Sequence, residues 1–255
     1  MPFKKIESEK LASAVVRQIE DLILQGILRP GERLPSEREL SERFGVSRPS
    51  LREAVAELQK SGLLCTKAGS GIFVADVLGS AFSPALIRLF SSNEQALFDY
   101  ISFRRDLEGL AAERAATYGS DTDLKVVDTL FAQMEAAHAK RNPAEEAQID
   151  AQFHMAIIEA SHNVVMIHMM RAMFDLLAEG VFYNRAIMFR NRTTRVRLLD
   201  QHRAMNAALQ ERDPVAARAA VAGHMDFVDH EMSVIRRAER NEATALLRLS
   251  HNDER

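Results

Sequence analysis

Two short helices joined by a tight turn are the feature that most constrains this sequence. Ser36, followed three residues later by Glu39, forms a capping box that starts a helix by satisfying backbone N–H groups of the first turn. Gly45 ends that helix, because glycine tolerates the left-handed conformation common at helix C-termini. Ser47 then caps a second helix, with Pro49 in its first turn, where a missing N–H costs little. These signals predict a helix-turn-helix, which presents the start of its second helix to a DNA groove.

The second predicted helix has an apolar face and a basic face. Leu51, Ala54 and Leu58 recur at helical spacing and are expected to pack on a core. Arg48 and Arg52 lie one turn apart on another face near the helix start, where they can reach phosphates and base edges together. Any surface helix can carry two arginines, but cap, turn, cap and paired arginines in this order favour DNA binding.

The residues after the motif predict a β-hairpin. Residues 63–67 and 72–75 have strand character, and Gly69 and Gly71 predict the turn between them. Such a hairpin can serve as a wing, whose glycine turn lets the backbone enter a minor groove while Lys67 contacts a phosphate. An ordinary structural hairpin fits the same residues equally well.

Strand signals end after the hairpin, and the fold class is expected to be mainly α. We expect a winged helix-turn-helix over residues 1–76, a linker over 77–94 with one short helix at 85–90, an all-α antiparallel bundle over 95–240 and a polar tail over 241–255. The helices predicted in the bundle cover residues 95–118, 122–140, 144–161, 164–189, 194–211 and 214–240.

The composition fits two globular domains. The chain has 255 residues, of which 47% are hydrophobic and 27% charged, enough to bury two cores. No apolar run approaches the roughly 20 residues that span a bilayer, so no membrane association is expected. Cys65 is the single cysteine and is expected to be a small core residue. With no internal disulfide possible, a cytoplasmic location is the simplest expectation.

The net charge of −3 is unevenly distributed. Residues 1–75 carry 12 Lys and Arg against 10 Asp and Glu, whereas the remainder carries 21 against 26. The basic excess lies in the predicted DNA-binding part but is small, so placed contacts and dimerisation must supply much of the affinity. An architectural DNA-packaging protein, which binds mainly through a large positive charge, is disfavoured.

Four side chains of metal-ligand type are expected to face the interior of the bundle. Asp150 and His154 lie one turn apart beside apolar neighbours, and His202 and His224 each lie on an apolar stripe. Three imidazoles and a carboxylate suit a divalent metal, zinc first, with nickel, manganese or iron as alternatives. The competing interpretation is a chance D-x-x-x-H pair and hydrogen-bonded core histidines. The histidines expected in surface, loop or tail positions are His138, His162, His168, His230 and His251.

Arg104 and Glu108, in the first helix of the bundle, allow two interpretations. A partly buried arginine beside a metal can hold a carboxylate ligand, because its planar fork matches two oxygens. The simpler alternative is an ion pair between Arg104 and Glu108, which are spaced i,i+4. A metal-dependent hydrolase acting on a small carboxylate is a rival function, but none of the four predicted ligands is free to act as a general base.

Two groups of motifs together resemble one known family. The first group is Leu34-Pro-Ser-Glu-Arg-Glu-Leu, Val46-Ser-Arg-Pro-Ser-Leu-Arg-Glu-Ala, Gly62-Leu-Leu and Gly69-Ser-Gly-Ile-Phe-Val. The second group is Arg104-x-x-x-Glu108-Gly-x-Ala-Ala, Asp150-x-x-Phe-His154, Ala160-Ser-His-Asn-Val-Val, Gln201-His202 and Gly223-His224. They are similar to the winged helix of GntR-family transcription regulators and to the FCD ligand-binding domain of the FadR subfamily, with the closest likeness to pyruvate-, lactate- and glycolate-responsive members.

The resemblance implies a homodimeric repressor, not an enzyme, that binds a palindromic operator in double-stranded DNA. The DNA contacts that it implies are Arg38, Ser47, Arg48, Ser50 and Arg52. Gly69 would lie in the minor groove at the wing tip. Ala68 stands where the fatty-acid-responsive member has a histidine, so we do not expect base reading by that position.

The resemblance also implies a ligand site in the helical domain. Its metal ligands would be Asp150, His154, His202 and His224. Arg104 would hold the carboxylate of an effector. The fatty-acid-responsive member lacks this metal site, so the resemblance favours a small organic acid of the pyruvate, lactate or glycolate type over an acyl-CoA.

Overall fold

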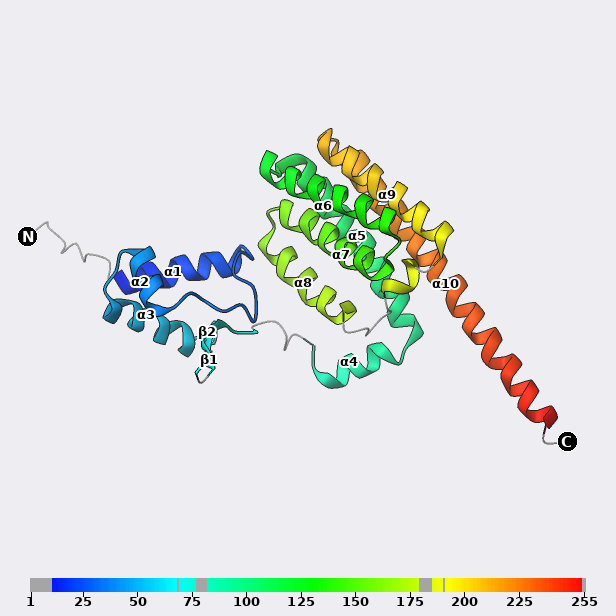
Figure 1. The fold of residues 1–255 in the computed structure, drawn as a ribbon, viewed down its shortest axis with the longest axis horizontal. Helices are drawn as coiled ribbons and strands as arrows, with labels where there is room; N and C mark the ends of the chain where they lie inside the picture. The colour runs from blue at the N-terminus through cyan, green and yellow to red at the C-terminus, as the bar shows by residue number, and fades with distance from the viewer. Residues whose placement is uncertain (1–10, 68, 77–81, 179–184, 190, 254–255) are drawn as a thin grey trace, which may run out of the picture. The chain divides into compact units, whose positions relative to one another are not determined.

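The computed structural model describes residues 11–67, 69–76, 82–178, 185–189 and 191–253. Within them the chain divides into two units, Met1–Ser83 and Pro84–Arg255. Helices dominate both units, and the described strands form one hairpin in the first (Figure 1). The expected fold class is therefore confirmed. Residues 77–81 of the expected linker lie outside the described residues.

The first unit packs three helices against the hairpin. Its elements are α1 (Leu11–Leu24), α2 (Glu37–Phe44), α3 (Arg48–Lys60), β1 (Leu64–Lys67) and β2 (Gly71–Val74). The strands are antiparallel, with Leu64 opposite Val74. Leu51, Ala54 and Leu58 of α3 are fully buried and share one core with α1 and the two strand residues. The apolar face predicted for α3 thus anchors it in the unit.

Local capping builds the motif as predicted. The Glu39 N–H donates to Ser36 Oγ at 3.3 Å, and the Ser36 N–H donates to the Glu39 carboxylate at 3.0 Å. Gly45 ends α2 with φ +64°. Ser47 caps α3 by accepting the Ser50 N–H at 3.3 Å. The start of α3 is therefore fixed by contacts within the motif itself.

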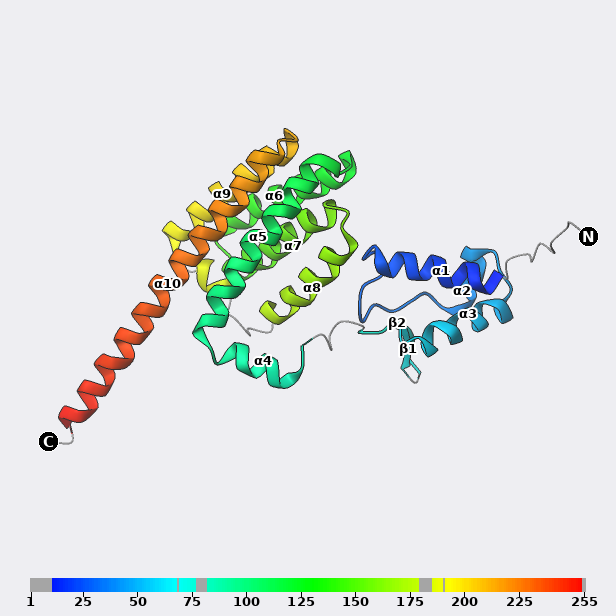
Figure 2. The ribbon, with the colours of Figure 1, turned by 180° about the vertical axis from the view of Figure 1, so that it is seen from behind.

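The second unit is a helical bundle (Figures 1 and 2). Its elements are α4 (Pro84–Ser91), α5 (Glu94–Tyr118), α6 (Asp121–Lys140), α7 (Pro143–Ala160), α8 (Val164–Ala178), the 3₁₀ helix η1 (Arg185–Phe189), α9 (Arg192–Gln210) and α10 (Pro214–Asp253). α5 packs along α10 and α7, while α6 packs on α7 and α9. None of the helices in the described part of the chain is long and apolar enough to cross a bilayer.

Three expectations differ from the structure. The helix expected over 164–189 is described as α8 as far as Ala178, and residues 185–189 form the 3₁₀ helix η1 instead of α-helix; residues 179–184 lie outside the described residues. The tail expected over 241–255 is instead a continuation of α10 to Asp253, because this stretch is rich in good helix formers and has no glycine or proline. Cys65 is only partly buried, since successive strand residues face opposite sides and Leu64 takes the core side.

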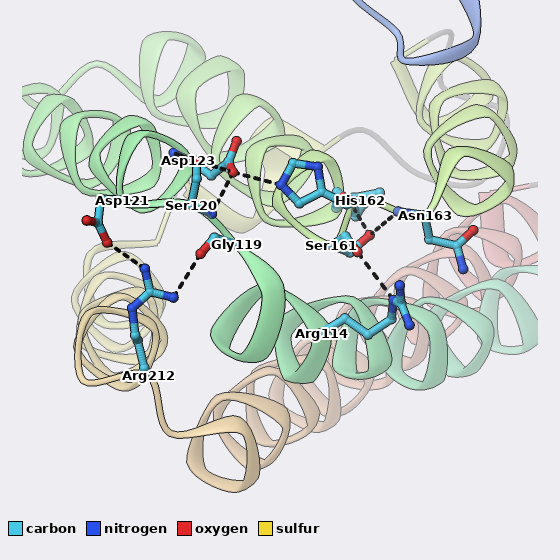
Figure 3. Close-up of polar contacts among 10 residues, drawn as sticks. Arg114, Gly119, Ser120, Asp121, Asp123, Ser161, His162, Asn163 and Arg212 are labelled. Carbon is cyan, nitrogen blue, oxygen red and sulfur yellow. Dashed lines mark hydrogen bonds and ion pairs between the residues drawn. The ribbon is translucent and has the colours of Figure 1, made fainter.

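Polar contacts join three interhelical turns at one end of the bundle (Figure 3). Arg212, between α9 and α10, donates to the Gly119 carbonyl between α5 and α6 at 2.8 Å. His162, in the turn after α7, lies with Nε2 2.8 Å from Asp123 Oδ2 of α6. Arg114 of α5 donates to that same α7–α8 turn. These contacts hold the turns after α5, α7 and α9 together at that end of the bundle.

Candidate nucleic-acid interface and candidate metal centre

The first turn of α3 presents a polar surface. Arg48 and Arg52 are exposed on either side of buried Leu51, so both project away from the core. Ser47 and Ser50 flank them, with their hydroxyl oxygens 2.9 Å apart. The structure therefore brings the residues predicted on α3 to one accessible end of the helix, as the docking geometry of a recognition helix requires.

Acidic side chains hold two of the arginines in this structure. Arg52 Nε lies 2.9 Å from Glu37 Oε2 at the start of α2, and Arg38 Nε lies 4.0 Å from Glu42 Oε1. Arg48 makes no hydrogen bond or ion pair with any residue that the structure describes. A phosphate that binds Arg52 at Nε must therefore displace or share the Glu37 carboxylate, whereas Arg48 is already accessible.

The turn of the hairpin has the backbone that its glycine predicts. Gly69 has φ +70°, and the Ser70 N–H donates to the Lys67 carbonyl at 2.9 Å. Lys67 Nζ lies 4.6 Å from the centroid of the Phe73 ring, a cation–π contact that supports the stem of the lysine. Ala68 lies outside the described residues.

Arg33 is a basic residue of this surface that the sequence analysis missed. It is exposed and forms a β-bridge with Phe73, so it extends the hairpin at its β2 side. Together with Arg52 it lines a surface cleft of about 510 Å³ between α3 and the hairpin. Its pairing with β2 has no signal in the sequence, because Arg33 precedes the motif and lies in no predicted strand.

Four predicted metal ligands converge in the interior of the bundle. Asp150 and His154 come from α7, His202 from α9 and His224 from α10, and each residue is at most 4% exposed. Each offers one ligand atom, and the four atoms lie within 4.8 Å of one another. His202 Nε2 is 3.0 Å from Asp150 Oδ1 and 3.2 Å from His154 Nε2. Three helices thus assemble the predicted set.

Hydrogen bonds on the outer side of two rings select the nitrogen that faces the cluster. His154 Nδ1 lies 2.6 Å from Glu108 Oε2, and His224 Nδ1 lies 3.0 Å from Gln201 Oε1. Both oxygens are acceptors, so each Nδ1 carries the proton and each Nε2 presents its lone pair to the cluster. His202 Nδ1 is buried without a hydrogen-bond partner among the described residues, while its Nε2 faces the other ligands. The donor set fits a divalent metal.

The protonation states of the site also suit a metal. Burial lowers the pKa of His154 despite the opposing charge of Glu108. Burial, reinforced by His202 and His154, holds the pKa of His224 well below its usual range. Burial raises the pKa of Glu108, but the charge of Arg104 and the contacts with His154 outweigh it and bring that pKa to about 2. The neutral imidazoles that result at His154 and His224 are the form in which histidine binds a metal.

Arg104 and Glu108 form the ion pair that was the simpler of the two expectations. Arg104 is 2% exposed, and its Nε lies 2.5 Å from Glu108 Oε1. The guanidinium carbon lies 5.1 Å from the centroid of the Phe174 ring and 5.8 Å from that of Tyr100. Because the second oxygen of Glu108 contacts His154, this carboxylate joins the buried arginine to the histidine cluster.

The chain matches known proteins over nearly its whole length. A family model described as bacterial regulatory proteins, gntR family, matches residues 11–74, and an FCD domain model matches residues 99–227. The Glc operon transcriptional activator of Escherichia coli (strain K12) is 36% identical over 85% of this chain and 87% of its own length. This chain belongs to the GntR family. Its combination of GntR and FCD domains is that of the FadR subfamily.

Other GntR-family relatives agree with this assignment. A regulatory protein of Escherichia coli (strain K12) named for the L-lactate dehydrogenase operon is 32% identical over 88% of this chain and 86% of its own length. A solved GntR structure from Streptococcus agalactiae covers 86% of this chain and 99% of its own, with a TM-score of 0.53 and 26% identity. This GntR-family chain is therefore a transcriptional regulator and not an enzyme, and the hydrolase alternative is set aside.

Proposed function

We propose that this regulator is a homodimeric repressor whose affinity for a short palindromic operator is controlled by a small organic acid. The acid binds at a divalent metal in the helical domain. The observation that carries this proposal is the buried set of three imidazoles and one carboxylate next to a buried arginine.

In the proposed DNA complex the start of α3 enters the major groove. Arg48 and Arg52 contact base edges and phosphates there, because they are exposed one turn apart at the helix start. Arg38, Ser47 and Ser50 add contacts that orient the helix. Lys67 contacts a phosphate beside the wing, and Gly69 lets the turn approach the minor groove.

A homodimer follows from the modest charge of one winged helix. A net excess of two basic residues over residues 1–75 gives little non-specific affinity. Two recognition helices related by a two-fold axis add their contacts on the two halves of a palindrome, which supplies both affinity and specificity.

The buried charges of the described helical domain favour a divalent cation. Arg104 pairs with Glu108 and Arg195 with Glu146, whereas Asp150 faces imidazoles. Three buried carboxyl groups thus face two buried guanidinium groups, a formal net charge of −1 among them. A divalent ion held by Asp150 and the three histidines supplies a Lewis-acidic position for a carboxylate oxygen; zinc is the first candidate, with nickel, manganese and iron as alternatives.

A small carboxylate completes the site beside Arg104. The planar guanidinium can bind two oxygens, and one carboxylate returns the metal-loaded interior to neutrality. The burial of Arg104 supports a small acid over a bulky one. One relative is named for an L-lactate dehydrogenase operon, so pyruvate, lactate and glycolate are the acids to test. The acid acts by preferring one arrangement of the bundle, which changes how the two recognition helices of the dimer meet DNA.

Repression is the proposed sign of regulation. A dimer on an operator that overlaps a promoter blocks polymerase by occupancy alone and needs no further contact. The Glc operon relative is named an activator, so a promoter reporter with and without the regulator separates the two signs. Higher reporter output in the presence of the regulator would contradict repression.

The decisive experiment measures operator binding, metal content and acid response on one preparation. Duplexes from promoters that flank the gene are titrated by fluorescence anisotropy with chelator-treated and zinc-reloaded protein, with and without each acid. We expect one acid to change operator affinity by about 5- to 150-fold, and only in the reloaded protein. His202→Ala should bind DNA, contain no metal and ignore the acid. A His202→Ala variant that retains metal and response would defeat the proposed site.

A further inference from the structure

A second buried ion pair lies close to the metal-ligand cluster. Glu146 of α7 is 2% exposed and Arg195 of α9 is 9% exposed. Arg195 Nε lies 3.1 Å from Glu146 Oε2, and Arg195 Nη2 contacts both Glu146 Oε1 and, at 3.0 Å, the carbonyl of His138. His138, expected at the surface, is partly buried with its Nδ1 3.3 Å from Glu146 Oε2. The pair therefore connects α7 and α9 to the last turns of α6.

The pair shares a helix face with the ligand cluster on both α7 and α9. On α7, Glu146 precedes His154 by two turns, with Asp150 between them. On α9, Arg195 precedes His202 by two turns. At a rise of about 1.5 Å per residue, these separations are about 12 Å and about 10.5 Å. Two cross-links between the same helices thus lie at nearly equal spacing along each.

α7 and α9 have little direct backbone contact with each other. α7 packs mainly on α6 and α5, and α9 packs mainly on α10 and α6. Contacts between side chains such as Glu146 with Arg195, and Asp150 with His202, carry the direct connection. Within the packing that α6 provides to both helices, two cross-links restrain rotation and sliding of α7 relative to α9 more than one cross-link does.

Stability alone does not explain why a charged pair occupies this position. Apolar residues of similar volume often stabilise a buried site as well as an ion pair or better. What the planar guanidinium offers in addition is directional contact with two oxygens and with the end of α6. The geometry thus specifies one register rather than simply filling space.

We infer that Glu146 and Arg195 are positioning residues for the metal centre. They hold α7 and α9 in the register in which Asp150 and His154 meet His202, without contributing ligand atoms themselves. This inference rests on the proposed metal site. Loss of the pair leaves all four ligands present but less well placed. Mutation of residues that position metal ligands typically lowers metal affinity by about 10- to 100-fold.

The test measures zinc affinity and cobalt spectra of the full-length protein. The double variant Glu146→Leu with Arg195→Met replaces the pair by apolar side chains, and Arg195→Lys retains the charge but removes the planar fork. We expect each to melt near the wild-type temperature, bind zinc at least about tenfold more weakly in competition with a chromophoric chelator, and give an altered Co²⁺ absorption spectrum. If one variant fails to fold, the other carries the test.

Arg203→Met is the matched control. Arg203 is next to His202 on α9 and pairs with Glu135 of α6, but its side chain is 49% exposed. It should leave zinc affinity and the cobalt spectrum unchanged. Folded variants of the buried pair with wild-type affinity and spectrum would overturn the inference, as would an equal loss in the control. Wild-type protein that binds no metal would instead overturn the proposed function, and this inference with it.

Discussion

Glu108 is the residue that links the two halves of the candidate ligand site. One oxygen contacts Arg104 at 2.5 Å and the other contacts His154 at 2.6 Å, and Glu108 itself is 2% exposed. An incoming carboxylate that binds Arg104 must share the guanidinium with Glu108, and any shift of Glu108 reaches His154 directly. Effector and metal are therefore expected to influence each other through this one side chain.

The ionised state of Glu108 gives a prediction for stability against pH. Its pKa in the folded protein, about 2, is below the ordinary value of 4.5. Its ionised form thus stabilises the folded state fully above about pH 4.5, by an amount on the order of 3 kcal/mol, and this stabilisation is lost as pH falls toward 2. Urea unfolding between pH 7 and 3 should show a steeper loss in the wild type than in Glu108→Gln. If the free energy of unfolding fell equally with pH in the wild type and in Glu108→Gln, the low pKa of Glu108 in the folded protein would be wrong.

Two glycines with opposite surroundings give a second prediction. A Cβ at Gly119 would lie 2.5 Å from the Ala115 carbonyl oxygen, at the corner shown in Figure 3. Backbone must move to accept it, so Gly119→Ala should lower the free energy of unfolding by about 1–3 kcal/mol. Gly223, inside α10, has nothing within 4 Å of such a Cβ, and Gly223→Ala should raise it by up to about 1 kcal/mol. Urea titrations measure both free energies of unfolding. Equal changes in the two variants would show that the space around each glycine does not determine the effect.

At the scale of elements, α3 is a rigid support for a few exposed side chains. Its buried face is complete, with Leu51, Ala54 and Leu58 at 0% exposure. Substitutions on the exposed face should therefore change DNA binding without changing the fold. This separation of faces makes the recognition helix testable residue by residue.

Arg48→Ala should weaken specific operator binding by about 1–3 kcal/mol, or roughly 5- to 150-fold. The reason is that Arg48 is exposed at the helix start and unpaired among the described residues. Anisotropy with operator and scrambled duplexes measures the loss. Lys60→Ala, at the other end of α3, is the control and should have a much smaller effect. Sedimentation of Arg48→Ala should match the wild type, and an unchanged operator affinity would remove Arg48 from the interface.

The sequence predicts those parts of the fold that depend on neighbouring residues. The capping box of Ser36 and the left-handed Gly45 involve contacts within a few positions, and both are present. The spacing of Asp150 and His154 predicts that they share a helix face. Spacing along one helix does not reveal which residue of another helix it meets. The contact of Glu146 with Arg195, 49 residues away, therefore became visible only in the structure.

At the scale of the whole molecule, metal binding is expected to add stability against unfolding to one unit only. The core of the first unit consists of its own helices and hairpin, and all four candidate ligands belong to the second. A metal that binds the folded site and not the unfolded chain adds free energy to the unfolding of the helical domain alone. The two units should therefore respond differently to removal of the ion.

Calorimetry of the full-length protein tests this difference. At zinc concentrations 100-fold above Kd the helical domain should gain about 2.7 kcal/mol, which for a unit of this size raises its melting temperature by roughly 5–10 °C. A chelator should reverse that gain and leave the winged-helix transition in place. In His202→Ala, which lacks one metal ligand, the melting temperature of the helical domain should be the same with zinc and with chelator. Equal shifts of both transitions would indicate that zinc binds outside the cluster, since the first unit contributes none of the four ligands.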